Sequence, residues 1–331
     1  MFLSPILGKI KKKLKAGGEE NHLSQYQKDL LFSRNSNVKV FNFWAELKKI
    51  EDLWFYQFIN RYQEGLYTSE RPITFFSVYG DREVMEVNRE RPRVFYTAEN
   101  VDQYRGYDDH CLKDVDLSIG FEYLDASNYL RFPLWITWFF KPLLDFENVI
   151  RQVNDISHFN YDFDRNRRFC TLIASHDQNG IRSEISKVVG QVGRVDFAGR
   201  FCNNTRELHK VYNNSKHYFL TLYKFNVCPE NSNKDGYVTE KIFEAINSGC
   251  IPIYWGSEGR PEPEVLNPDA ILFYDRSDPR RLLRQVDELN SNEKLYREFV
   301  LQDRFLPCAV EYIWNRLEEL YRRLKEIEKN L

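Results

Sequence analysis

The sequence YKFNVCPEN at residues 223–231, followed after four residues by GYVTEK at 236–241, is the most informative part of the chain. The first segment begins with strand-forming residues and ends in a polar loop, as a buried strand does when it runs into a turn. Thr239 then stands where a helix N-cap is expected, and Gly249 stands where that helix would end. A strand, a loop and a helix in this order predict an α/β unit.

The same alternation extends along the chain in both directions. Apolar, β-branched or aromatic runs predict strands, and the amphipathic segments between them predict helices. The predicted strands are 73–79, 93–97, 117–121, 169–174, 194–198, 218–227, 251–255 and 270–274; the predicted helices lie around 41–62, at 181–189, 205–212, 239–247 and 279–290, and around residue 295.

A polar stretch without periodicity, residues 160–168, predicts the boundary between two domains. The chain of 331 residues is long enough for two domains of ordinary size. We therefore expect a domain at residues 1–163, a second at 164–309, and a charged amphipathic helix at 310–331. The fold class predicted is α/β, with two doubly wound, Rossmann-like domains that face a cleft.

Composition restricts the class of protein. The net charge is −2, so no strong field favours nucleic acid as a partner. The 25 Phe, 20 Tyr and 6 Trp give aromatic faces that can stack on sugars or bases, although most such side chains serve as core. The six cysteines form no CxxC pair, which argues against a zinc site and favours free thiols in a cytoplasmic setting. Cys170 and Cys250 stand in apolar runs and are expected to be buried.

The first fifteen residues have two interpretations. Leu3, Leu7, Ile10 and Leu14 fall at helical spacing among five lysines, which suits a helix on an anionic membrane surface. A disordered basic segment is the alternative. No apolar run is long enough to span a bilayer, and the lysines follow the apolar residues instead of preceding them as in a signal peptide. Peripheral membrane contact through residues 1–15 therefore stays an open expectation.

Glu240 and Lys241 stand together in the first turn of the helix predicted at 239–247. Ligands of open α/β sheets bind where strands end, and a helix N-terminus there offers free backbone N–H groups to a phosphate. A sugar nucleotide suits such a site, since Glu240 can chelate a ribose diol while Lys241 meets the diphosphate. For this pair alone, a carboxylate that serves the helix dipole and a solvated lysine are the more frequent explanation.

The wider context favours the sugar nucleotide. The segments YKFN, Glu230–Asn231 and GYVTEK, together with IPIYWG at 251–256, resemble the donor-binding signature of the α-1,3-fucosyltransferase family. FYTAEN at 95–100 and IGF at 119–121 resemble it more loosely. The resemblance implies a GT-B fold with an N-terminal acceptor domain and a C-terminal domain that binds GDP-fucose. It also implies that the anomeric carbon is inverted.

Site residues follow from the resemblance position by position. Glu240 would hold the ribose, and Lys241 and Arg182 would face the diphosphate. Asn231 and Tyr237 would line the same donor pocket. Arg182 also follows a predicted strand near the start of a helix, where an arginine can clamp a diphosphate.

Glu99 follows the strand predicted at 93–97 and is the expected general base. In the family, the glutamate of this YTxEN motif is the proposed base, and an inverting transfer needs one base on the acceptor hydroxyl. A carboxylate that caps a turn is the alternative reading of Glu99. Three nearby acidic residues compete with it for the role: Asp102, Asp108 and Asp109.

No metal or other cofactor is expected. Asp114-Val115-Asp116 and Asp162-Phe163-Asp164 match the short DxD pattern of metal-dependent glycosyltransferases, but such triplets often arise by chance. The six histidines show no metal-ligand spacing. Trp135 and Trp138 are candidates for stacking on an acceptor sugar, with burial in the core as the alternative.

The function expected is the inverting transfer of L-fucose from GDP-fucose to N-acetylglucosamine in a glycan of the N-acetyllactosamine type. The expected setting is the cytoplasm of a bacterium, and peripheral contact with the inner membrane surface stays an open alternative. Two alternatives stay open: a GT-B enzyme that uses another sugar nucleotide, and a binding module without catalytic activity. The joint presence of Glu99, Arg182, Glu240 and Lys241 argues against the binding module.

Overall fold

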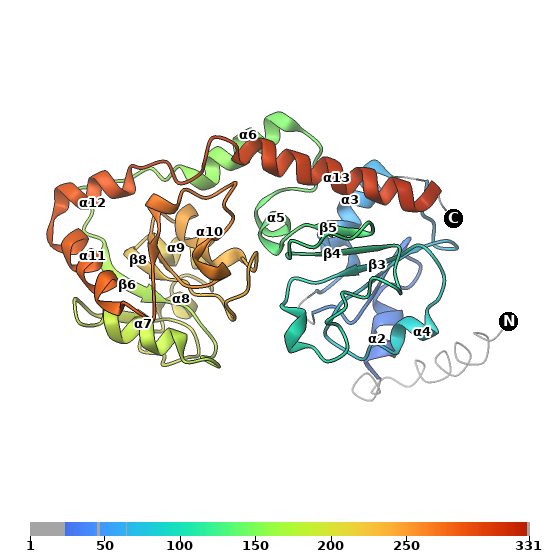
Figure 1. The fold of residues 1–331 in the computed structure, drawn as a ribbon, viewed down its shortest axis with the longest axis horizontal. Helices are drawn as coiled ribbons and strands as arrows, with labels where there is room; N and C mark the ends of the chain where they lie inside the picture. Colours follow the sequence, from blue (N-terminus) through green and yellow to red (C-terminus); the bar gives the residue numbers. More distant parts are fainter. Residues whose placement is uncertain (1–23, 45–46, 64, 330–331) are drawn as a thin grey trace. The chain divides into compact units, whose positions relative to one another are not determined.

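The computed structural model describes residues 24–44, 47–63 and 65–329 (Figure 1). They form two five-stranded sheets with helices between the strands, so the predicted α/β class is confirmed. The elements of the first half are strands β1 (Val38–Phe41), β2 (Ile73–Phe76), β3 (Arg93–Tyr96), β4 (Leu117–Gly120) and β5 (Tyr129–Arg131), with helices α2 (Gln25–Phe32), α3 (Trp54–Tyr62), α4 (Val84–Val87), α5 (Leu134–Phe139) and α6 (Phe146–Ser157).

The first sheet has the strand order β1-β2-β3-β4-β5. Strands β1, β2 and β3 are parallel, with Val40 opposite Phe75 and Phe75 opposite Val94. These side chains are buried, which fits near-continuous apolar strands covered on both faces. Strand β1 was not predicted, and the helical pattern expected around 41–62 begins at its last residue. Four residues are too few to show the period of two that marks a strand.

The second sheet contains β6 (Arg168–Leu172), β7 (Val195–Phe197), β8 (Tyr223–Val227), β9 (Ile251–Tyr254) and β10 (Leu272–Phe273). Its order is β10-β9-β8-β6-β7, and all four pairings are parallel. The chain moves one way from β6 to β7 and the other way from β8 to β10. The order therefore reverses between β6 and β8, and this switch point is where open α/β sheets bind ligands.

Six helices accompany this sheet: α7 (Ile181–Val189), α8 (Glu207–Lys210), α9 (Lys216–Leu220), α10 (Glu240–Asn247), α11 (Pro279–Ser291) and α12 (Glu293–Val300). The last helix of the described chain, α13 (Ala309–Lys329), contacts β5 of the first sheet through Arg323, which donates to the carbonyl of Tyr129 at 3.0 Å. The single strand predicted at 218–227 is wrong in its first part. Residues 216–220 form α9, which buries Phe219 and Leu220, and only Tyr223–Val227 are extended. A ten-residue apolar run does not reveal a break between a helix and a strand.

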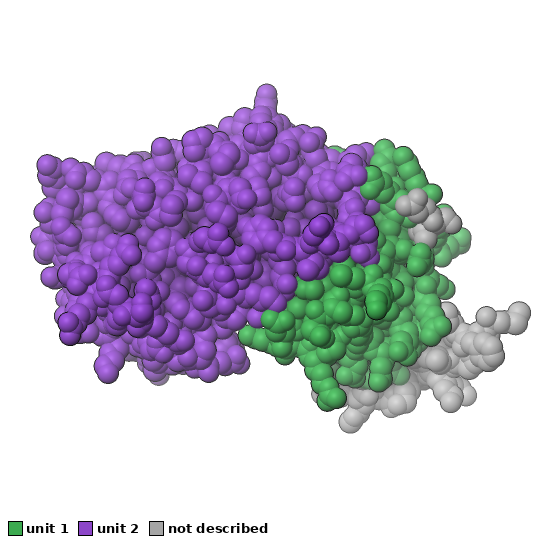
Figure 2. Space-filling model, viewed as in Figure 1, with its two compact units in different colours: residues 1–96, 101–118, 325–331 green, residues 97–100, 119–324 purple. Residues whose placement is uncertain are grey.

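The chain divides into two compact units (Figure 2). The first includes the described residues up to 96, residues 101–118 and the end of α13 from 325; the second contains residues 97–100 and 119–324. The predicted boundary at 163 falls between the two sheets but inside the second unit. Residues 119–163 belong there because α5 and α6 contact α10; the ring of Trp135, for example, stacks on Phe243 at 4.5 Å between centroids.

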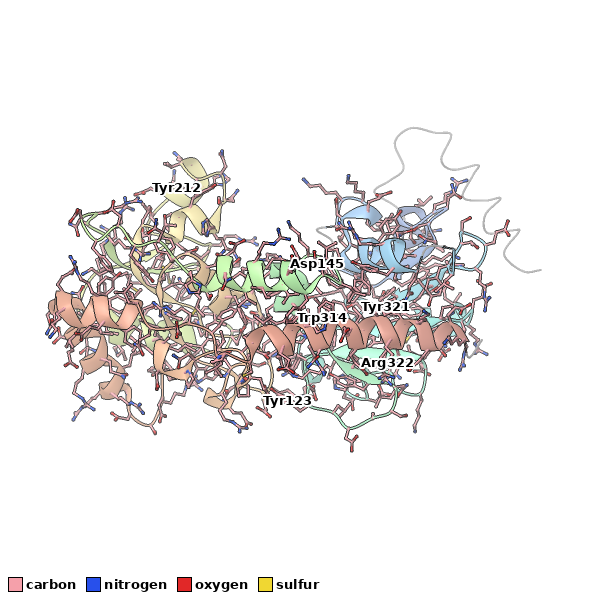
Figure 3. All side chains as sticks on the ribbon, turned by 90° about the horizontal axis from the view of Figure 1, so that it is seen from above. Tyr123, Asp145, Tyr212, Trp314, Tyr321 and Arg322 are labelled. Atoms are coloured by element: carbon pink, nitrogen blue, oxygen red, sulfur yellow. The ribbon has the colours of Figure 1, made fainter. Side chains whose placement is uncertain are left out.

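Helix α13 corresponds to the amphipathic helix predicted at 310–331. Trp314, Tyr321 and Arg322 mark its course in Figure 3. The ring of Trp314 meets Phe146 at 5.5 Å in an edge-to-face contact, the geometry that aromatic pairs prefer. None of the described helices combines the length and the apolar character needed to cross a bilayer. The proposed membrane helix at residues 1–15 lies outside the described residues.

All six cysteines are free, and Cys170 and Cys250 are fully buried as predicted. Cys170 belongs to the apolar core of the second sheet. Burial raises the pKa of the Cys250 thiol to about 11, so it packs as a neutral side chain.

We expect Gly199→Ala to destabilise the second unit. Gly199 passes so close to the end of β6 that an added Cβ would lie 2.0 Å from the carbonyl oxygen of Ala174. Backbone atoms cannot move aside as a flexible side chain can, so the free energy of unfolding should fall by about 1–3 kcal/mol in a denaturant titration. The neighbouring exposed Arg200, changed to Ala, serves as the control and should alter it by about 0.5 kcal/mol or less. Unchanged stability of Gly199→Ala would contradict the close packing of Gly199 against the backbone of Ala174.

Candidate functional site

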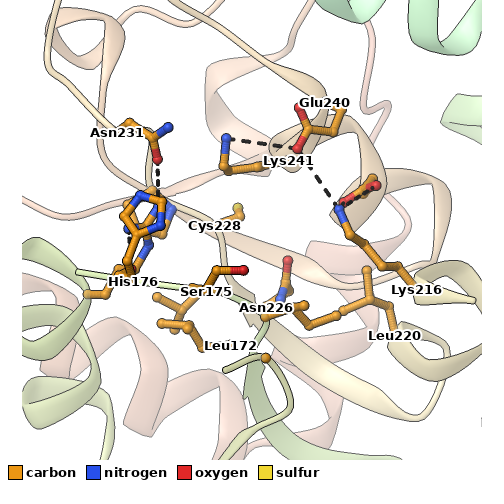
Figure 4. Close-up of a pocket in the computed structure, with 17 residues that line it drawn as sticks. Leu172, Ser175, His176, Lys216, Leu220, Asn226, Cys228, Asn231, Glu240 and Lys241 are labelled. Carbon is orange, nitrogen blue, oxygen red and sulfur yellow. Dashed lines mark hydrogen bonds and ion pairs between the residues drawn. The ribbon is translucent and has the colours of Figure 1, made fainter. Parts of the chain in front are cut away.

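A cavity of about 230 Å³ opens at the switch point of the second sheet (Figure 4). One wall follows the end of β6, from Leu172 to His176, and another follows the end of β8, from Asn226 to Pro229. The first turn of α10 contributes Glu240 and Lys241. Strand ends and a helix N-terminus thus meet at one point, as the sequence predicted for the segment 223–241.

Glu230 has no exposed surface and organises the entrance to α10. Its Oε1 accepts a hydrogen bond of 2.7 Å from the backbone N–H of Thr239, and its Oε2 accepts one of 2.7 Å from the Thr239 hydroxyl. Lys241 Nζ donates to the same Oε2 at 3.1 Å and to Thr239 Oγ1 at 2.7 Å. Thr239 is the N-cap residue as predicted, but its side chain makes no cap hydrogen bond, since Glu230 engages it instead.

Gly256 makes room for this carboxylate. Its φ is +142°, a conformation that side chains rarely adopt, and an added Cβ would lie 2.9 Å from both Cβ and Cγ of Glu230. The backbone N–H of Glu230 also donates to the carbonyl of Trp255 at 2.8 Å. Residues 254–256 and Glu230 therefore fit together only with glycine at position 256.

The charges of Glu240 and Lys241 match a sugar nucleotide. Burial by itself would lower the pKa of Lys241, but the nearby carboxylates of Glu230 and Glu240 outweigh it and raise that pKa above its usual value. Burial would likewise raise the pKa of Glu240, but Lys241 and Lys216 lower it. Glu240 Oε1 lies 3.9 Å from each of the two lysine nitrogens, and Figure 4 shows Glu240 between them. At neutral pH the cavity thus holds a cation and an anion side by side, a combination that can pair with a phosphate and accept from sugar hydroxyls.

Arg182 and Asn231 meet on the other side of the cavity. Arg182 stands in the first turn of α7 and is almost fully buried, and burial lowers its pKa. Its Nη2 donates to Asn231 Oδ1 at 2.7 Å, and its backbone N–H donates to Asp177 Oδ1 at 3.0 Å. The structure therefore brings four of the predicted donor residues into one cavity: Arg182, Asn231, Glu240 and Lys241.

Tyr237 contacts the predicted base. It is buried and is not among the residues that line this cavity, and its hydroxyl donates to Glu99 Oε2 at 3.0 Å. Next to it, Asn100 Nδ2 donates to Ser232 Oγ at 3.3 Å. Residues 97–100 and the loop at 231–239 belong to the same unit. Burial and the Glu99 carboxylate both raise the pKa of Tyr237, so the hydroxyl keeps its proton and stays a donor.

Two protein-family models match the chain, one in each half. A model of the C-terminal domain of glycosyltransferase family 10 (fucosyltransferase) matches residues 163–320, and one of the alpha-(1,3)-fucosyltransferase FucT N-terminal domain matches residues 38–138. The chain belongs to glycosyltransferase family 10. The predicted family is thereby confirmed, and the fold is the GT-B type of α/β architecture.

Relatives within and near family 10 differ in how much they share with the chain. The alpha-(1,3)-fucosyltransferase FucT of Helicobacter pylori is 29% identical over 250 residues, which are 66% of this chain and 50% of that protein. The human GDP-fucose protein O-fucosyltransferase 3 is 36% identical over 81 residues, or 24% of this chain and 17% of that protein. The chain thus spans about half or less of the length of these relatives.

Two solved structures share the family 10 fold. A crystal structure of an alpha1,3-fucosyltransferase matches with a TM-score of 0.60 at 20% identity, and covers 86% of this chain and 89% of that one. One described as being with GDP-fucose matches with a TM-score of 0.52 at 24% identity, and covers 75% and 77% of the two chains.

Neither DxD triplet is among the residues that line the cavity. Asp114 forms an ion pair with Arg82, and Asp116 accepts from the backbone N–H of Arg93 at 2.8 Å and pairs with Arg91 at 3.1 Å. Asp109, a competitor of Glu99, also pairs with Arg82 at 2.7 Å. In the described part of the chain, no group of three or more His, Cys, Asp or Glu side chains could hold a metal ion.

The prediction that Trp135 stacks on an acceptor sugar is wrong. Its side chain has no exposed surface and stacks on Phe243 of α10, because the apolar helix α5 packs its ring inward. Trp138 is 58% exposed and keeps its candidacy. Residues three apart lie near one face of a helix, so their spacing did not reveal that one tryptophan is buried and the other exposed.

Sequence reasoning missed three polar residues of the site. Glu230 was part of the motif but had no assigned role, and Lys216 and Glu244 were not considered at all. Glu244 stands four residues after Glu240, so the i, i+4 spacing on α10 was the available signal. Lys216 had none, because it comes to the cavity through α9, which was predicted as strand or loop.

We expect Glu230→Gln to weaken folding and nucleotide binding together. The amide removes the charge that pairs with Lys241. Glu230 has no exposed surface but Lys241 is 23% exposed, so the free energy of unfolding should fall by about 2–3 kcal/mol, less than for a fully buried pair. The stabilisation of the protein by GDP in a thermal-shift titration should also fall, since Lys241 loses the partner that holds it. Glu207→Gln breaks the exposed ion pair with Arg168 and is the control, with an expected loss of about 1 kcal/mol or less. Equal losses in the two variants would contradict a central role for Glu230.

Proposed function

We propose that this chain transfers L-fucose from GDP-fucose to a hydroxyl of N-acetylglucosamine in a glycan acceptor, with inversion at the anomeric carbon. The proposal depends most on one contact, the 3.0 Å hydrogen bond between Tyr237 and Glu99. It joins a carboxylate suited to act as a base to the loop that leads directly to Glu240 and Lys241.

The cavity supports a sugar nucleotide as donor. The Glu240 carboxylate can accept from both hydroxyls of a ribose, and Lys241, Arg182 and the N-terminus of α10 can face the diphosphate. The printed description of one similar structure names GDP-fucose, and the names of the curated relatives are those of fucosyltransferases. These names favour guanosine diphosphate and fucose over another base and sugar.

Glu99 and the residues of the donor cavity have different tasks in the proposed reaction. Glu99 takes the proton of the acceptor hydroxyl, whose oxygen forms a bond to the anomeric carbon as the bond from that carbon to the diphosphate breaks. Attack opposite to the leaving group inverts the carbon. Lys241, Arg182 and the helix N-terminus stabilise the negative charge that develops on the diphosphate.

Activity is expected to persist in excess EDTA. In the proposed reaction Lys241, Arg182 and the N-terminus of α10 stabilise the charge on the leaving diphosphate, so we expect no divalent cation to be required. Turnover would be measured with labelled GDP-fucose and N-acetyllactosamine before and after chelation. Complete loss that manganese restores would contradict the proposal and direct attention to Asp114-Val115-Asp116.

Substitution of Glu99 should separate chemistry from binding. Glu99→Gln keeps the shape and an acceptor for Tyr237 but is not basic, so turnover should fall by ~10²–10⁴-fold while GDP affinity hardly changes. Glu240→Gln should instead weaken GDP binding first, because it loses ribose contacts. Near wild-type turnover of Glu99→Gln would exclude Glu99 as the base, and Asp102 would be tested next.

A further inference from the structure

A second polar pair that lines the cavity, Lys216 and Glu244, has no task in the reaction described above. Glu244 follows Glu240 by one turn of α10, and both line the cavity. Lys216, at the start of α9, donates from Nζ to Glu244 Oε1 at 3.0 Å and to Oε2 at 2.9 Å. The Glu244 side chain is 16% exposed and that of Lys216 is 38% exposed, so the carboxylate lies at the wall of the cavity and the lysine reaches it from the rim.

The space beside the pair is suited to a flat ring. Leu172, Ala174, Leu220 and Val227 line it, and they come from the ends of β6 and β8 and from α9. Ligand pockets combine such apolar walls with a few placed polar groups that fix orientation. With Glu240 at the ribose and Lys241 at the diphosphate, the base of the nucleotide points away from Lys241, along α10 towards Glu244.

We infer that Glu244 and Lys216 recognise the guanine base of the donor, an inference that depends on the proposed function. The ring edge of guanine presents one acceptor, O6, beside two donors, N1–H and the 2-amino group. Lys216 Nζ can donate to O6, and the two oxygens of Glu244 can accept from N1–H and the amino group. A carboxylate has about four lone-pair sites, so Glu244 can accept these bonds while it stays paired with Lys216.

Other bases fit the pair less well. Adenine presents an amino donor where Lys216 donates, and its N1 is an acceptor opposite the carboxylate. Uracil offers a single N–H between two carbonyl acceptors, so one oxygen of Glu244 would face an acceptor. Buried polar groups that are left unpaired in this way are what give a binding site its discrimination.

Inosine diphosphate tests the inference at a single group, because it is GDP without the 2-amino group. Binding of GDP, inosine diphosphate, ADP and UDP to the full chain would be measured by calorimetry. We expect inosine diphosphate to bind on the order of tenfold more weakly than GDP, the loss of one hydrogen bond to a charged acceptor. Equal binding of the two by the wild-type protein would overturn the inference without any variant.

Glu244→Gln should abolish the preference for GDP over inosine diphosphate, because its amide group meets a donor of the base with a donor. Glu319→Gln is the matched control, since Glu319 also accepts a paired contact, from Arg322 at 2.6 and 2.7 Å, but lies on α13 away from the cavity. It should keep the full preference. An undiminished preference in Glu244→Gln would place the base elsewhere and overturn the inference.

The nucleotide series also separates this inference from the proposed function. GDP that binds more tightly than UDP, yet no more tightly than inosine diphosphate, would leave the proposed donor intact and remove the role of Glu244. UDP that binds as tightly as GDP, or no binding by any of the four, would overturn both. The thermal stability of each variant, measured alongside, shows that it is folded.

Discussion

The ion pair between buried Glu230 and half-buried Lys241 is the interaction on which the rest of the site depends. A carboxylate without exposed surface is unfavourable unless it is paired and hydrogen-bonded. Glu230 meets this condition with the amide and hydroxyl of Thr239 and with Lys241, and these three groups form the entrance to α10. One side chain at the end of β8 therefore sets where α10 begins, and with it where Glu240 stands. The positions of Glu240 and Lys241 in the cavity thus depend on Glu230, which follows β8 in the chain.

Much of the fold could be predicted from the sequence because its signals are local. Helix α7 was predicted with its observed bounds, and the strands β2, β3 and β4 lie within the predicted segments. Apolar runs with a turn at each end carry that information within a few residues. The three-residue strand β5 and the start of α9 were missed, since such short elements depend on packing against distant parts of the chain.

The site was predictable where a motif fixes neighbours in sequence, and unpredictable where packing fixes neighbours in space. Glu240 and Lys241 are adjacent, so their meeting at the cavity needed only the start of a helix. Tyr237 and Glu99 are 138 residues apart, and nothing in either segment indicated that they form a hydrogen bond. The same holds for Lys216 and Glu244. Trp135 was wrongly predicted to stack on an acceptor sugar, since its side chain is buried in the core.

The close fit of Gly256 against Glu230 has a consequence for how such a cavity can diversify. A side chain at 256 displaces Glu230, and a smaller residue at 230 gives up the anchor of Lys241, so neither position can change usefully by itself. Substitutions accumulate one at a time, and each intermediate has to fold. The corner formed by Glu230, Lys241 and Gly256 can therefore change only by paired substitutions, whereas the opposite end of the cavity is free of this constraint.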